Sequence, residues 1–217
     1  MAIDPQNSNN VYAGTNTSGV FKSTNWGGNW GAINTGLATT SVRTLAVDPH
    51  NPITIYAGTD KGVFKSTNSG GIWNPVNTGL DDMHVYVHAL AIDPQNSSII
   101  YVGTDAGVFK STNSGGNWSA INTGLTYTRV FALGVDPQTP NTIYAGTIDG
   151  GVFKSTNGGG HWSAINAGLT SLNILTLSVD PQNPRLVYAG TDEGGVFAIN
   201  QLTNADSLHF PMISGKQ

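Results

Sequence analysis

Short apolar stretches of four to six residues recur along the whole chain, and each is bounded by Gly, Pro, Asn or Asp. Val, Ile, Tyr, Phe and Thr are the main residues within them, which is typical of β-strands separated by turns. No stretch has the apolar spacing of three to four residues that marks an amphipathic helix. The pattern therefore predicts an all-β protein.

The apolar stretches repeat as a unit. An Asp-Pro dipeptide recurs every 43 to 45 residues, at Asp4, Asp48, Asp93, Asp136 and Asp180. Each of the first four units contains four strand-like segments, which in the second unit are Leu45 to Asp48, Ile55 to Thr59, Val63 to Ser66 and Trp73 to Asn77. Four short strands in about 40–45 residues are the signature of a propeller blade. We expect one domain, a five-bladed β-propeller of four-stranded antiparallel blades, with blades at approximately 1–36, 37–79, 80–124, 125–168 and 169–213.

The first strand of each unit has one large face and one small face. In unit two, Leu45 and Val47 point to one side, whereas Thr44 and Ala46 point to the other. This alternation predicts that the large face of one blade packs against the small face of its neighbour.

The fifth unit departs from the repeat, because Gly195-Val196-Phe197 passes directly into Ala198-Ile199-Asn200 without a Trp-led segment. We expect residues Leu208 to Ile213 to supply the missing strand and close the ring, which would make the protein a monomer. The alternative is a three-stranded blade whose edge pairs with a second copy in a homo-oligomer.

A hairpin of sequence Ser-x-Asn-x-Gly-x-x-Trp joins the third and fourth segments of the first four units. It resembles the Asp-box, or bacterial neuraminidase repeat, Ser-x-Asp-x-Gly-x-x-Trp, with Asn in place of Asp. Asn retains the oxygen that closes an Asx turn, so we expect the hairpin to form. The four copies consist of Ser23, Asn25, Gly27 and Trp30; Ser66, Asn68, Gly70 and Trp73; Ser111, Asn113, Gly115 and Trp118; and Ser155, Asn157, Gly159 and Trp162.

The Asp-box family includes sialidases, xyloglucan-degrading glycosidases, sortilin-type receptors and photosystem assembly factors. In these proteins the box is a peripheral hairpin that builds the blade, so the resemblance implies a structural role for the 16 residues. Functional residues are then expected elsewhere, in the loops that differ between units.

Composition narrows the range of partners. Only 10% of the residues are charged and the pI is about 5.6, so the chain lacks the basic surface that nucleic acids require. The sequence contains no run of about 18 apolar residues, so we expect no membrane insertion. The low-charge surface and the resemblance favour a secreted or periplasmic bacterial protein, although the N-terminal residues show no signal segment.

The variable loops lie between the second and third strands and before each first strand, on one face of the propeller. The shorter loops contribute Asp60, Asp105, Asp149 and Asp192, which could ring the channel mouth as a cation or polyhydroxyl site or could serve only as turn residues. The longer loops contribute Asp82, His84, Tyr86, His88, Tyr127 and Arg129. Two His and a carboxylate can bind zinc, but nothing in the sequence fixes a tetrahedral site, so we expect neither a metal nor a cofactor.

Three functions remain open. We expect a non-catalytic module that binds a glycan or protein partner on the variable face, with Tyr86 and Tyr127 as exposed aromatic contacts. The first alternative is a scaffold without its own ligand, either excised from a longer propeller or engineered. The second is a glycosidase, with Asp81 and Asp82, or Asp60 and Asp105, as its carboxyl pair.

One repeated lysine precedes each of the four hairpins. Its regularity indicates a role in blade construction, and we expect it to pair with a carboxylate, for which an Asp-Pro aspartate is the candidate. The four residues are Lys22, Lys65, Lys110 and Lys154.

Overall fold

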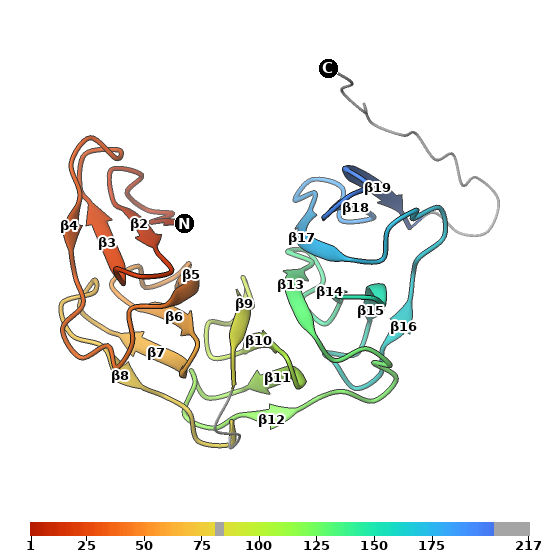
Figure 1. Ribbon diagram of the computed structural model, residues 1–217, viewed down its shortest axis with the longest axis horizontal. Helices are drawn as coiled ribbons and strands as arrows, with labels where there is room; N and C mark the ends of the chain where they lie inside the picture. Colours follow the sequence, from red (N-terminus) through yellow and green to blue (C-terminus); the bar gives the residue numbers. More distant parts are fainter. Residues whose placement is uncertain (81–84, 202–217) are drawn as a thin grey trace.

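The computed structural model describes residues 1–80 and 85–201, which form five antiparallel sheets (Figure 1). These residues contain no α-helix, and hence no helix of the length and hydrophobicity needed to cross a membrane. Each sheet corresponds to one unit of the repeat. The prediction of an all-β, five-bladed propeller fold is therefore confirmed.

The strands follow the predicted segments. Blade 1 contains β1 (Ala2–Ile3), β2 (Val11–Gly14), β3 (Val20–Ser23) and β4 (Gly31–Ala32). Blade 2 contains β5 (Val42–Val47), β6 (Ile55–Thr59), β7 (Gly62–Ser66) and β8 (Asn74–Pro75). Blade 3 contains β9 (Val87–Ile92), β10 (Ile100–Thr104), β11 (Gly107–Ser111) and β12 (Ser119–Ala120). Blade 4 contains β13 (Val130–Val135), β14 (Ile143–Thr147), β15 (Gly151–Ser155) and β16 (Ser163–Ala164). Blade 5 contains β17 (Ile174–Val179), β18 (Leu186–Thr191) and β19 (Val196–Asn200).

The five blades follow an arc, with the long first strands β5, β9, β13 and β17 toward its inner side (Figure 1). Blades 1 and 5 stand on either side of an opening, and no hydrophobic cluster of the described residues joins them. The predicted closing strand, Leu208 to Ile213, lies outside the described residues. Ring closure by the tail therefore stays a prediction.

Four hydrophobic clusters hold adjacent blades together. In each, a Tyr and a Val from one blade meet the first strand of the next, as Tyr12 and Val20 meet Leu45 between blades 1 and 2. The small face is tightly filled, because a β-carbon on Gly103 would lie 2.7 Å from Val130 of the following blade. Large faces thus pack on small ones, and this interlocking buries apolar side chains of both blades.

The four Ser-Asn hairpins are closed by the same three hydrogen bonds. In the third, Ser111 Oγ donates to Asn113 Oδ1, and the backbone N–H of Asn117 donates to the same oxygen at 2.8 Å. The N–H of Gly115 donates to Ser111 Oγ at 2.9 Å. An amide oxygen therefore closes the turn, as expected for an Asx turn.

The repeated lysines do not form the predicted ion pairs. Lys65 Nζ donates 3.1 Å to the carbonyl oxygen of Ser114 in the next blade, and it lies 5.3 Å from the centre of the Tyr56 ring. Asp48 affects Lys65 only at longer range, where its charge partly offsets the lowering of the lysine pKa by burial. The prediction was wrong because the partner is a backbone carbonyl of the neighbouring blade, which the sequence of one unit does not reveal.

Candidate functional site

One position in the first strand of blades 2 to 5 is displaced from the regular ladder. The strand pairing shifts between the residues on either side of it, which is the mark of a β-bulge. Bulges redirect a side chain and are frequent beside functional sites. The residues at this position are Arg43, His88, Phe131 and Leu175.

Three of these side chains belong to a stack that crosses blades 2 to 4. The Arg43 guanidinium lies 5.0 Å from the centre of the Tyr86 ring, and the Tyr86 and His88 rings are 6.4 Å apart. The His88 ring stacks on Phe131 at 4.0 Å, and the Arg129 guanidinium lies 5.7 Å from the Phe131 ring. These five residues with Asp105 are called the rim cluster below. Cation–π contacts and ring stacking hold the side chains of the rim cluster in place relative to one another.

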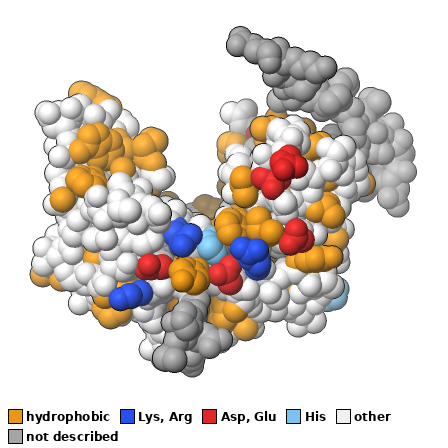
Figure 2. Space-filling view, in the orientation of Figure 1, with side chains coloured by type: hydrophobic (Ala, Val, Ile, Leu, Met, Phe, Trp, Pro, Cys, Tyr) orange, Lys and Arg blue, Asp and Glu red, His pale blue; other side chains and the backbone are white. Residues whose placement is uncertain are grey.

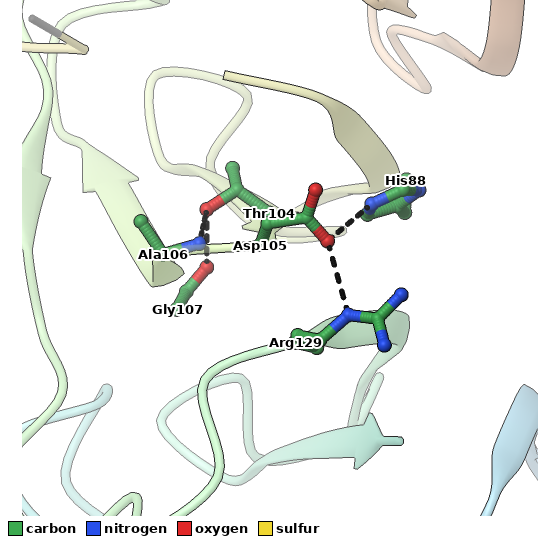
Figure 3. A network of polar contacts seen from close by, with 6 residues as sticks. All are labelled: His88, Thr104, Asp105, Ala106, Gly107 and Arg129. Carbon is green, nitrogen blue, oxygen red and sulfur yellow. Dashed lines mark hydrogen bonds and ion pairs between the residues drawn. The ribbon is translucent and has the colours of Figure 1, made fainter. Parts of the chain in front are cut away.

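Asp105 links two blades within the rim cluster (Figure 3). Its Oδ1 lies 3.0 Å from His88 Nε2 of its own blade and 3.5 Å from Arg129 Nε of the next. The turn that carries Asp105 is fixed by Thr104, whose Oγ1 donates to the Gly107 carbonyl and accepts from the Ala106 N–H. Both contacts of the carboxylate use Oδ1, so Oδ2 is not used by either residue.

His88 is neutral near pH 7. Burial lowers its pKa, and the charges of Arg43 and Arg129 lower it further, whereas the hydrogen bond and charge of Asp105 oppose the shift. An ionised carboxylate only accepts hydrogen bonds, so Nε2 carries the ring proton and donates a hydrogen bond to Asp105 Oδ1. The cluster thus holds a neutral imidazole between two permanent cations.

The remaining predicted carboxylates, Asp60, Asp149 and Asp192, lie in local turns. Asp149 takes a left-handed conformation with φ of 66°, and its N–H donates to Asn173 Oδ1 at 2.8 Å. Asp192 accepts from Asn173 Nδ2 at 2.8 Å and from Ser171, and the Asn173 contact is the main cause that lowers the pKa of Asp192. Asp60 also lies in a β-turn, between β6 and β7. These features fit turn chemistry.

The two predicted aromatic contacts differ. Tyr127 is 46% exposed and packs over Gly150, where an added β-carbon would lie 2.5 Å from its ring. Tyr86 is half-buried and has Arg43 over its ring, so it is less exposed than expected, and its contact with a ligand stays a prediction. The alternation around it is confirmed, because Val85 and Val87 are buried on the opposite side.

Asp82 and His84 lie outside the described residues. Across 1–80 and 85–201, no group of three or more His, Asp or Glu side chains is placed to hold a metal ion. Figure 2 shows that charged side chains and the pale-blue histidine gather on this face around the middle of the arc, where β9 and β13 lie in Figure 1. The rim cluster is therefore the strongest candidate site on this face.

Sequence reasoning missed Arg43 and Phe131 as site residues. Both stand five positions before an Asp-Pro aspartate, as His88 does. Comparing this position across the units, which reads Arg, His, Phe and Leu, would have revealed a variable column in an otherwise repetitive strand.

No family model matches the chain, and no curated protein matches it in sequence. Solved structures do match it. An ancestral GH74 enzyme is 28% identical with a TM-score of 0.71, and the match covers 92% of this chain and 27% of that one. The extracellular domain of BT4673 from B. thetaiotaomicron is 18% identical with a TM-score of 0.72, covering 92% and 26%. YCF48 bound to D1 peptide is 17% identical with a TM-score of 0.65, covering 91% and 62%.

These comparisons establish the propeller fold and correct one expectation. The chain spans about a quarter of the GH74 enzyme, and further GH74 structures match it with TM-scores of 0.77 and 0.74. Because the solved structures that match the chain include glycoside hydrolases, the expectation that the chain is not an enzyme is contradicted.

Proposed function

We propose that the chain is a secreted carbohydrate-recognition propeller whose variable face binds a polysaccharide. The observation that carries this proposal is the rim cluster, in which a carboxylate, two guanidiniums and three rings from three blades form one interlocked surface. The GH74 neighbours, one of them a xyloglucanase from Xanthomonas campestris, support a glycan as the ligand. The extracellular domain of BT4673 among the neighbours supports secretion.

The accessible parts of the site have the chemistry that a sugar requires. The side chain of Arg129 is 58% exposed and that of Asp105 is 38% exposed, so the guanidinium can donate to hydroxyls while Asp105 Oδ2 accepts from them. Tyr127, two residues before Arg129, offers a ring face for the apolar side of a pyranose. The half-buried rings of the stack keep Arg129 in place before the ligand arrives, which lowers the entropic cost of binding.

The test is calorimetric titration of the purified chain with xyloglucan oligosaccharides and with a cellulose-derived oligosaccharide. We expect Arg129→Ala and Tyr127→Ala each to weaken binding about tenfold or more, since each removes a direct contact. Arg185→Ala, on the Asp-Pro face of blade 5, and Trp26→Ala, an exposed aromatic of a hairpin, are matched controls that should bind normally.

Release of reducing ends from xyloglucan is measured with the same proteins. Hydrolysis that is lost in Asp105→Asn would make the face an active site as well as a binding site. Absence of binding to both oligosaccharides, or equal losses in the site and control variants, would contradict the proposal.

A further inference from the structure

At the interfaces of blades 2–3 and 3–4, two kinds of contact hold a hairpin of the following blade in place. On the Asp-Pro side, Lys65 and Lys110 donate to the hairpin carbonyls of Ser114 and Gly158 at 3.1 and 3.2 Å. At the other end of the hairpin, each tryptophan indole donates to the backbone of the preceding blade, as Trp118 Nε1 does to the Val76 carbonyl at 2.8 Å. The preceding blade thus forms hydrogen bonds with both ends of such a hairpin.

Blade 4 has the same binding surface, but blade 5 has no described hairpin to fill it. A pocket of about 400 Å³, lined in part by Tyr144, Lys154 and Gln201, lies where the lysine would reach a hairpin carbonyl. A second pocket of about 270 Å³ extends from Lys154 to Ile165, the counterpart of the tryptophan-binding Val76. Lys154 Nζ donates instead to Gln201 Oε1 at 3.1 Å. The two pockets together are called the blade 4–5 groove.

We propose that residues 202–217 of the same chain occupy the blade 4–5 groove and complete blade 5 as its fourth strand. The 16 residues follow Gln201, one position after the end of β19, the strand next to which a fourth strand belongs.

The register of the other blades predicts which tail residues pair. The phenylalanine of each third strand pairs with a residue eleven positions later in the fourth, as Phe109 does with Ala120 and Phe153 with Ala164. The same spacing places Leu208 opposite Phe197 and Ser207 opposite Ala198. The apolar residues Leu208, Phe210, Met212 and Ile213 then follow the predicted start of the strand.

The tail has the length of the other hairpins but not their sequence. Ile199 stands at the position of the hairpin serine, and Asp206 stands at the position of the tryptophan. The tail has no tryptophan to occupy the pocket near Ile165. This pocket is therefore filled only if apolar residues of the tail reach it. The length, the register and the hollow on blade 4 all indicate the same occupant.

Disulfide trapping tests this directly, because the natural chain has no cysteine. The double variant Ala198→Cys with Ser207→Cys places two thiols at the predicted cross-strand pair. The matched control is Lys110→Cys with Ser119→Cys, the same register in blade 3, where the pairing is present. We expect mild oxidation to give an intramolecular disulfide in monomers at a rate similar to that of the control.

Disulfide-linked dimers of the Ala198→Cys, Ser207→Cys variant would overturn the proposal, because they would show that a second copy covers the edge of β19. Free thiols in that variant, with the control fully oxidised, would overturn it as well.

A chain ending at Gln201 provides a second measurement that needs no engineered thiol. We expect its Tm to fall by about 5 °C or more, since an interface strand and its apolar contacts are lost. The Ala198→Cys, Ser207→Cys variant should show the opposite shift, with a higher Tm when oxidised than when reduced. A truncated chain that melts at the temperature of the full chain would contradict the proposal.

Discussion

The blade faces that are buried between two blades and the open faces of the end blades 1 and 5 carry equivalent residues in different surroundings. Trp118 of blade 3 is 4% exposed, whereas Trp30, at the same place in blade 1, is 41% exposed. Val152 of blade 4 is fully buried, whereas Val196 of blade 5 is 49% exposed. In each pair the residue occupies the same place in the repeat, but only the buried one has a following or preceding blade packed on that face.

This comparison shows where the stability of the protein resides. A blade of this size does not bury its own large residues, so burial arises between blades. The hydrogen bonds within each hairpin are alike in blades 1 and 3, as the Ser23–Asn25 and Ser111–Asn113 pairs show. Local geometry is thus set by each unit, whereas most of the hydrophobic stabilisation depends on the contact between units.

The largest expected difference is between the two tryptophans. Trp118→Ala should lower the free energy of unfolding by about 3–5 kcal/mol, because it leaves a cavity between blades 2 and 3 and an unused carbonyl on Val76. Trp30→Ala should cost under about 1 kcal/mol, since the exposed ring buries little more when the protein folds. Urea unfolding of both variants measures the difference. Equal losses would mean that another part of the protein covers Trp30 in solution.

A smaller difference is expected between two glycines of the second strand. A β-carbon on Gly146 would lie 2.5 Å from Ile174 Cγ2 of the next blade and 3.0 Å from its Cβ, so Gly146→Ala should cost about 1–3 kcal/mol. At Gly190 the close atom is only a methyl of Thr176 in the same blade, which can rotate away. We expect Gly190→Ala to change the free energy of unfolding by less than about 1 kcal/mol.

Thermal and urea unfolding of these two variants report whether a blade packs against the second strand of blade 5. If Gly190→Ala is as destabilising as Gly146→Ala, the outward face of blade 5 is covered in solution in the same way as the outward face of blade 4. The comparison between the end blades and the interior blades then fails.

The repeat made the fold predictable, because its turn residues and alternating faces recur in every unit. Site residues on the variable loops were partly predictable for the same reason, since His88, Asp105 and Arg129 stand out against constant neighbours. Arg43 and Phe131 were missed because a bulge is a feature of strand pairing, which the sequence of one strand does not display. Contacts between blades, such as Asp105 with Arg129, depend on the rotation from one blade to the next.

The lysine prediction failed for a related reason. It assumed a carboxylate partner such as Asp48, whereas Lys65 donates to a backbone carbonyl in the following blade. The alternation of large and small residues was thus enough to predict which faces meet between blades, whereas the hydrogen-bond partner of a single side chain across that interface was not predictable from one unit.

The smallest expected effect concerns the bulge position, which holds buried His88 in the interior and exposed Leu175 at the end. The pKa of His88 is lowered in the folded protein, mainly by burial, so between about pH 6.5 and that lower pKa the unfolded chain binds more protons than the folded one. Acidification from pH 7.5 to 5.5 should therefore reduce the free energy of unfolding.

His88→Leu, which introduces the residue found in blade 5, should lose less stability than the natural chain over the same pH interval. His50→Gln, a change at an exposed histidine to the residue found in the other units, is the matched control and should keep the full pH dependence. Urea unfolding at both pH values gives the comparison, and an NMR titration of the ring locates the His88 pKa. A natural chain whose stability rises on acidification relative to His88→Leu would show that His88 is protonated in the fold, with the Asp105 carboxylate outweighing burial and the two arginines.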